Sequence, residues 1–103
     1  MAESVAEPSR EDVDQLAGLT VLEFGASWCP HCQAVQPLLE QLLNQRGEIK
    51  HIKVEDGKGK PLGRSFRVKL WPTLVFLRDG QVVTQMSRPS DLEIHQGFER
   101  LAD

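Results

Sequence analysis

The sequence predicts an α/β domain in which a central mixed β-sheet is flanked by helices on both faces. Helical and strand patterns alternate along the chain, and two consecutive strands then form a hairpin, which favours this arrangement. The predicted inner strands have apolar residues at both parities, as strands covered on both faces do. The 103 residues suit one compact domain, and neither a linker nor an internal repeat divides them. We therefore expect a single domain over residues 1–103, with residues 1–9 as a loose N-terminal arm.

The composition is that of an ordinary soluble globular protein, with 40% hydrophobic and 26% charged residues. The net charge of −3 disfavours nucleic acid as a partner, because phosphate binding requires a basic face. No apolar run reaches the length of a membrane span, so we expect no membrane association. The polar, acidic start lacks the features of a signal peptide, so we expect a cytoplasmic protein; a periplasmic location fits only if a signal was trimmed. We also expect a monomer. One basic stretch is interpreted as a solvated face: Lys58, Lys60, Arg64, Arg67 and Lys69.

The first half of the chain predicts two helices and two strands. A helix over Ser9–Ala17 has a capping residue at its start and is ended by Gly18. Residues 19–25 are β-branched and apolar and predict a buried strand. Apolar residues at helical spacing then predict a helix from near Cys29 to about Arg46, and residues 49–54 predict a second strand.

The second half predicts a short helix, a hairpin and a last helix. Residues 61–66 begin with a proline, which the first helical turn tolerates. Residues 73–78 and 81–86 predict two strands joined by a turn at Asp79-Gly80. A capping box at residues 90–93 opens the last helix, whose apolar residues share one face: Ile94, Phe98 and Leu101.

The two cysteines form a single Cys-x-x-Cys pair, Cys29 and Cys32. A bond between them would close too short a loop to stabilise the fold, so chemistry explains the pair better than architecture. Cys29 lies where a buried strand gives way to a helix, and a helix N-terminus stabilises a thiolate. We therefore expect Cys29 to be the nucleophile in disulfide exchange and Cys32, one turn deeper and more shielded, to be the resolving thiol.

The residues around the pair predict how it is tuned. Pro30 suits the first helical turn and stiffens the loop, and His31 can stabilise a nearby thiolate as an imidazolium. Trp28 is expected to be a lid over the site, with a core tryptophan as the alternative. Two other readings of the cysteines stay open. They could be inert core residues, or half of a zinc site, although zinc takes four ligands and the three histidines form no second paired cluster.

Separated motifs lie along the chain: Val21-Leu22-Glu23-Phe24, the Trp28-Cys29-Pro30-His31-Cys32 segment, Pro37 eight residues after Cys29, Trp71-Pro72-Thr73 and Asp79-Gly80. Together these motifs make residues 10–103 resemble the thioredoxin family. The resemblance implies the thioredoxin fold. It also implies a cis bond between Trp71 and Pro72, in a loop that packs beside the disulfide and binds the extended backbone of a substrate. Trp71, Pro72 and Thr73 are thus candidate substrate-binding residues, although from the residues alone Pro72 could simply begin a strand. Trp71 is bulkier than the family's usual aliphatic residue and could contact substrate or cap the core.

Glu23 is an acid within an apolar strand. The family often has an acid at this position, buried beneath the resolving cysteine, which suggests that Glu23 accepts the proton of Cys32. Burial without a partner would raise the pKa of this carboxyl. Lys53 falls where the family carries a lysine, and we expect it to approach and tune Glu23. In the alternative, both side chains reach solvent. We assign no role to His51 and His95.

The resemblance implies a thiol–disulfide oxidoreductase that acts on protein substrates and is recycled by a disulfide reductase. Electrons would pass through the Cys29–Cys32 pair without a cofactor or metal. Typical thioredoxins have Gly-Pro between the cysteines, whereas the Pro-His here resembles a periplasmic disulfide-oxidase family, whose inserted helical domain this chain has no room for. We therefore expect a potential more oxidising than that of typical thioredoxin. Arg88 replaces a glycine often found near the groove. The alternative function is a binding module that docks a partner, with redox chemistry secondary.

Overall fold

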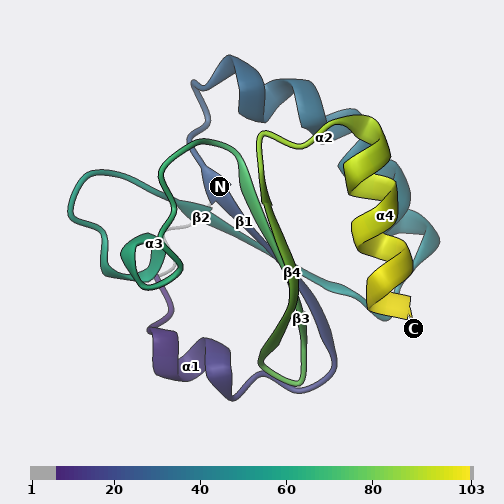
Figure 1. Cartoon of the computed structure of the whole chain (residues 1–103), viewed down its shortest axis with the longest axis horizontal. Helices are drawn as coiled ribbons and strands as arrows, with labels where there is room; N and C mark the ends of the chain where they lie inside the picture. Colours follow the sequence, from purple (N-terminus) through teal and green to yellow (C-terminus); the bar gives the residue numbers. More distant parts are fainter. Residues whose placement is uncertain (1–6, 103) are drawn as a thin grey trace.

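The computed structural model describes residues 7–102, and the expected α/β architecture is confirmed. Strand β1 pairs in parallel with β2 and antiparallel with β3, which pairs antiparallel with β4, so the sheet order is β2-β1-β3-β4. Helices α2 and α4 lie on one side of the sheet and α1 and α3 on the other (Figure 1). The elements are α1 (Arg10–Asp14), β1 (Leu19–Gly25), α2 (Pro30–Gln45), β2 (Lys50–Glu55), α3 (Pro61–Ser65), β3 (Thr73–Arg78), β4 (Gln81–Ser87) and α4 (Asp91–Ala102).

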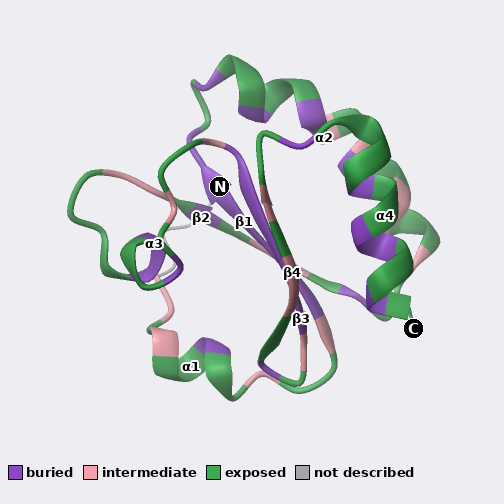
Figure 2. Cartoon of the chain, viewed as in Figure 1, coloured by how far each residue is buried: buried purple, intermediate pink, exposed green. Residues whose placement is uncertain are grey.

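Each face of the sheet has its own hydrophobic core, which explains why the inner strands are apolar at both parities. Successive strand residues point to opposite faces, so Val21 packs under α2 and α4 whereas its neighbour Leu22 packs toward α1 and α3. Figure 2 shows β1 and β3 buried along their length and the helices buried only on their inner sides. The first core includes Leu39, Leu74, Phe76, Ile94, Phe98 and Leu101; the second includes Val13, Phe24, Val54, Leu62, Phe66, Val75 and Leu77.

The N-terminal helix is shorter than predicted. Ser9 caps α1 as expected, in a capping box completed by Asp12. The helix ends at Asp14 instead of Ala17, because the chain is then held by the hairpin turn: Gly18 donates to the carboxylate of Asp79, and the Asp79 N–H donates to the Gly18 carbonyl, each over 2.8 Å. Of the arm predicted over residues 1–9, residues 1–6 lie outside the described residues.

The hairpin turn and the last helix form as their local signals predict. Asp79 and Gly80 both have positive φ, 51° and 80°, as a tight two-residue hairpin turn requires. A Cβ at Gly80 would collide with the Asp14 carbonyl, so a glycine is needed for space as well as for conformation. The predicted capping box of α4 is confirmed by two hydrogen bonds, Ser90 N–H to Glu93 Oε1 over 2.8 Å and Glu93 N–H to Ser90 Oγ over 3.2 Å.

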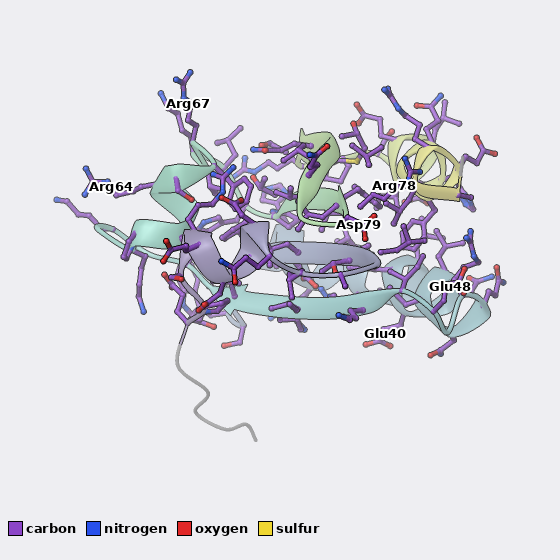
Figure 3. All side chains as sticks on the ribbon, turned by 90° about the horizontal axis from the view of Figure 1, so that it is seen from below. Glu40, Glu48, Arg64, Arg67, Arg78 and Asp79 are labelled. Carbon is purple, nitrogen blue, oxygen red and sulfur yellow. The ribbon has the colours of Figure 1, made fainter. Side chains whose placement is uncertain are left out.

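Some charged surface side chains bond to another element of the fold, and others project into solvent. Arg78 donates to the carbonyl oxygen of Leu101 over 2.8 Å and so ties β3 to the end of α4, beside which it lies in Figure 3. Arg64 and Arg67 instead project outward at the end of the molecule opposite α4 (Figure 3), and the whole basic stretch is exposed, as expected of a solvated face. Within residues 7–102, no helix is long and apolar enough to cross a membrane.

Candidate active site

The two cysteines lie at the start of α2, in the geometry that their sequence context predicts. Cys29 is the N-cap residue, with extended backbone angles, and Pro30 is the first helical residue. Both thiols are free, and the Cys32 backbone N–H donates to Cys29 Sγ over 3.3 Å. Each cysteine is 5% exposed, so surface area does not distinguish the two thiols. Burial nevertheless acts more strongly on Cys32, where it is the largest cause of a raised pKa, as the deeper position predicts.

The pKa of Cys29 is lowered from its ordinary value. Burial alone would raise it, but hydrogen bonds from the Cys32 thiol and from the backbone N–H groups of Cys32 and His31 outweigh that effect. The positive charge of Arg88 lowers the pKa further. These N–H groups belong to the unpaired first turn of α2, so the helix start itself stabilises the thiolate.

The pKa of Cys32 moves in the opposite direction, to about 11. Burial is the largest cause, and the hydrogen bond that the thiol gives to Cys29 adds to it, as do the negative charges of Cys29 and Glu23. A hydrogen bond from the Ala26 backbone opposes the rise. Near neutral pH, Cys29 is therefore the better nucleophile, and Cys32 must lose a proton before it can attack.

Two tryptophans border the pair. Trp71 packs against Ala26 and both cysteines, and its indole N–H donates to Asp56 over 2.9 Å. Trp28 is 68% exposed and meets Trp71 edge-on, with ring centroids 5.5 Å apart. The alternative that Trp28 is a core residue is therefore wrong.

The loop before β3 lies beside the cysteines, and its Trp71–Pro72 peptide bond is cis, as the resemblance implied. Arg88 holds this loop: its backbone N–H donates to the Pro72 carbonyl over 2.8 Å, and its Nε donates to the Trp71 carbonyl over 2.9 Å. The Thr73 side chain is buried and bonded within the protein, donating to the Leu70 carbonyl over 2.6 Å. Any contact of Thr73 with a substrate would therefore involve its backbone.

Glu23 is 3% exposed, so the alternative that it reaches solvent is wrong. Its Oε1 lies 2.7 Å from His51 Nε2, and its Oε2 accepts a 2.6 Å hydrogen bond from the Gln36 amide. From the sequence, burial is expected to raise the pKa of Glu23, but this pKa is lowered. Burial raises it, but the hydrogen bonds from His51 and Gln36, with the charges of His51 and Lys53, outweigh burial. The carboxyl is therefore ionised near neutral pH, so it can accept a proton, but it is a weaker base than the expected rise would have made it.

Lys53 acts on Glu23 less directly than expected. It pairs with Glu23 in the register of β1 and β2, but its Nζ donates to the Oε1 of Gln36 over 3.2 Å. The direct partner of Glu23 is His51, to which the sequence analysis assigned no role. The signal that could have found it is alternation along β2, because His51 and Lys53 lie two residues apart and so face the same side of the sheet.

A cavity of about 500 Å³ joins the resolving cysteine to the acid, with Cys32, Glu23 and Gln36 among its lining residues. Cys32 closes against Gly25, where an added Cβ would lie 2.6 Å from the sulfur. The described part of the chain holds no group of three or more His, Cys, Asp or Glu side chains that could hold a metal ion.

Most of the chain is similar to known thioredoxins. The thioredoxin family model matches residues 2–98. A thioredoxin of Listeria monocytogenes is 39% identical over 67 residues, which are 64% of this chain and 65% of that protein. Thioredoxin H5 of Arabidopsis thaliana is 24% identical over 86 residues, 84% of this chain and 73% of that protein.

A solved structure, that of reduced thioredoxin 2 from Pseudomonas aeruginosa PAO1, is 54% identical in sequence. It superposes with a TM-score of 0.82 and covers 95% of this chain and 92% of its own. The family match over nearly the full length agrees with the fold, with the cysteine pair at a helix start and with the cis-proline loop beside it. The chain belongs to the thioredoxin family of disulfide oxidoreductases.

Proposed function

We propose that the protein exchanges disulfides with protein substrates, with Cys29 as the attacking thiolate and Cys32 as the resolving thiol. The observation that carries the proposal is the opposite pKa shift of two hydrogen-bonded thiols, lowered at Cys29 and raised to about 11 at Cys32. A thiolate at Cys29 attacks, and a protonated Cys32 waits until the mixed disulfide has formed.

In the reducing direction, the exchange takes two steps. The Cys29 thiolate attacks one sulfur of the substrate disulfide, forming a Cys29–substrate bond and releasing the other substrate sulfur as a thiolate. Cys32 then loses its proton to Glu23 and attacks Cys29, which forms the Cys29–Cys32 disulfide and releases the second substrate thiolate. A disulfide reductase returns two electrons and two protons to the pair. The family's own dithiol does this chemistry, so no further cofactor is required.

The surface beside Cys29 suits an extended substrate segment. Trp28 offers an exposed apolar ring, and Trp71 and Pro72 present the backbone of the cis-proline loop next to the sulfurs. Lys53 acts on the proton acceptor through Gln36 and by its charge. Trp28, Trp71 and Pro72 would therefore contact the substrate, whereas Glu23 and Lys53 would serve the proton of Cys32.

The Pro-His pair between the cysteines makes the disulfide more oxidising than that of typical thioredoxin. His31 supports the Cys29 thiolate through its backbone N–H. Anything that stabilises the thiolate favours the dithiol and raises the reduction potential. We place this potential between the ~−270 mV of thioredoxin and the ~−120 mV of the periplasmic oxidase DsbA. A docking module gains nothing from this geometry, because a scaffold does not need two thiols with separated pKa values.

The proposal is tested by the reduction of insulin disulfides with dithiothreitol as the electron source. Wild type is expected to accelerate insulin precipitation, and Cys29→Ser is expected to lose this activity. His95→Gln, an exposed change on α4, is the matched control and should behave as wild type. A folded, reduced wild-type protein that gives no more reduction than Cys29→Ser would contradict the proposed function.

A further inference from the structure

The buried carboxylate of Glu23 lines one hollow of the protein, and its partner His51 lines a neighbouring one. Glu23 and Cys32 line the same cavity of about 500 Å³. His51 contacts Glu23 and lines a second hollow of about 360 Å³, together with Glu7, Pro8, Lys53, Glu55 and Lys60. Glu23 therefore shares a cavity with the resolving cysteine and a hydrogen bond with the imidazole of His51.

The solvent exposure of the side chains increases from Glu23 to His51. The Glu23 side chain is 3% exposed, whereas that of His51, on the edge strand β2, is 22% exposed. The other carboxylate oxygen of Glu23 is held by Gln36, an amide that cannot take up a proton near neutral pH. Of the two side chains hydrogen-bonded to Glu23, His51 alone can both accept a proton and reach the surface.

We infer that His51 is the proton outlet of Glu23, which takes the proton of Cys32 from the buried carboxyl to solvent during each exchange. The inference rests on the proposed function, in which Glu23 accepts that proton. His51 does not touch the reacting sulfurs, so it is a positioning residue that acts through Glu23.

The proton path balances with the exchange. As Cys32 attacks Cys29, the Cys29–substrate bond breaks, the Cys29–Cys32 bond forms and the substrate sulfur leaves with the electron pair. The Cys32 proton moves to Glu23 and then to Nε2 of a neutral His51, which leaves a carboxylate beside an imidazolium. The imidazolium then gives its Nδ1 proton to water, and proton exchange with solvent returns the ring to the neutral tautomer with a free Nε2.

Other charged groups set the field around His51. Glu23 faces His51 from β1, and Lys53 and Glu55 follow His51 on β2. Glu7 and Lys60 line the second hollow together with His51. On α2, Cys32 and Gln36 lie beyond Glu23, and the exposed Glu40 follows Gln36 by one turn. Because Glu40, Lys53, Glu55 and Lys60 are exposed, salt screens them, so the buried Glu23 has the strongest influence on the charge of His51.

The two steps can be followed separately with one equivalent of DTNB (dithiobis-nitrobenzoate). Mixed with reduced protein, it releases one thionitrobenzoate when Cys29 attacks and a second when Cys32 resolves the mixed disulfide. In the second phase Cys29 carries no thiol, and burial, the largest cause of the raised pKa of Cys32, still acts on that thiol. The pKa of Glu23 is lowered from 4.5, so a step between pH 5 and 8 reports on a histidine. The variants are His51→Gln, which keeps a hydrogen-bond donor but cannot relay a proton, and His95→Gln as the control.

We expect the second phase of wild type and His95→Gln to slow as the pH falls from 8 to 5. In His51→Gln, the second phase should be slower by roughly tenfold at pH 8, less than the ~100-fold of a directly acting base, because Glu23 still takes the proton. It should also lose the step between pH 5 and 8, while the first phase stays unchanged and shows that the site is folded. In His51→Ala, added imidazole should restore the second phase.

Two results would overturn the inference alone. In one, the second phase of His51→Gln keeps the wild-type rate and pH profile, which would mean that the proton leaves through the cavity beside Cys32. In the other, His51→Gln slows the second phase equally at every pH and imidazole restores nothing, which would mean that His51 only holds Glu23 in place. A wild type that lacks the second phase would contradict the proposed function as well.

Discussion

The backbone N–H of Cys32 donates a 3.3 Å hydrogen bond to the sulfur of Cys29, so the residue proposed to resolve the mixed disulfide also stabilises the thiolate that forms it. Cys29 takes the place that Ser, Thr or Asp usually has at a helix start, where the side chain accepts from an unpaired N–H. Capping of α2 and activation of the nucleophile are thus the same interaction.

The first prediction concerns the thiol of Cys32, which also donates to Cys29 and lowers its pKa. Cys32→Ala removes that donor, whereas Cys32→Ser replaces it with a hydroxyl. We expect the pKa of Cys29 to be higher in Cys32→Ala than in Cys32→Ser. The rate of Cys29 alkylation by iodoacetamide as a function of pH measures both values. Equal pKa values in the two variants would mean that the backbone donors alone activate Cys29.

The second prediction concerns His31. His31→Pro removes both the imidazole and the backbone N–H that bonds to Cys29, whereas His31→Gly removes only the imidazole. Both changes should make the reduction potential more negative, and the proline should do so by the larger amount, since each ~30 mV corresponds to ~1.4 kcal/mol. Equilibration with glutathione measures the potential. If His31→Pro has the wild-type potential, His31 does not tune the pair.

The third prediction concerns Gly25, whose missing side chain leaves room for Cys32. An alanine there would place Cβ 2.6 Å from the Cys32 sulfur, so the thiol must shift. We expect Gly25→Ala to lower the free energy of unfolding by about 1–3 kcal/mol, as overpacking does, and to slow the resolving step. Urea denaturation measures the first effect. Gly47→Ala is the control, because its added Cβ has no atom within 4 Å apart from those of Gly47 and its two chain neighbours. A loss of stability as large as that of Gly25→Ala would contradict the crowding.

The fourth prediction concerns pH and Glu23, whose pKa in the folded protein is lowered from its ordinary value of 4.5. A lowered pKa means that the ionised carboxyl stabilises the fold above about pH 4.5 and that this stabilisation is lost as the pH falls through the folded-state value. The free energy of unfolding should therefore drop more between pH 7 and pH 3 in wild type than in Glu23→Gln. Parallel curves for the two proteins would show that Glu23 has the same pKa folded and unfolded.

Features that depend on neighbouring residues were predictable from the sequence. The capping box at Ser90, the turn at Asp79-Gly80 and the start of α2 at Cys29 rest on local backbone chemistry, and each forms as predicted. The cis bond at Pro72 followed from the family resemblance. The predicted end of α1 was wrong because a residue distant in the sequence holds the chain there. The helix stops at Asp14, and Gly18 beyond it is hydrogen-bonded to Asp79.

Contacts between residues far apart in the chain could not be predicted from the sequence. The pKa of Glu23 was predicted to rise because its partners were unknown, and those partners come from two other elements, His51 on β2 and Gln36 on α2. They meet Glu23 through the β1–β2 register and the packing of α2 over the sheet. The same holds for Trp71, whose bond to Asp56 spans fifteen positions.

The assignment of roles to the two cysteines is tested most directly by trapping. Cys32→Ser and Cys29→Ser are each incubated with a disulfide-bonded protein such as insulin, and mixed disulfides are resolved on non-reducing gels and located by mass spectrometry. We predict that Cys32→Ser accumulates a covalent complex through Cys29, because nothing remains to resolve it. Cys29→Ser should not, because burial, the largest cause of the raised pKa of Cys32, keeps that thiol protonated. Equal trapping by both variants, or trapping by Cys29→Ser alone, would contradict the assignment.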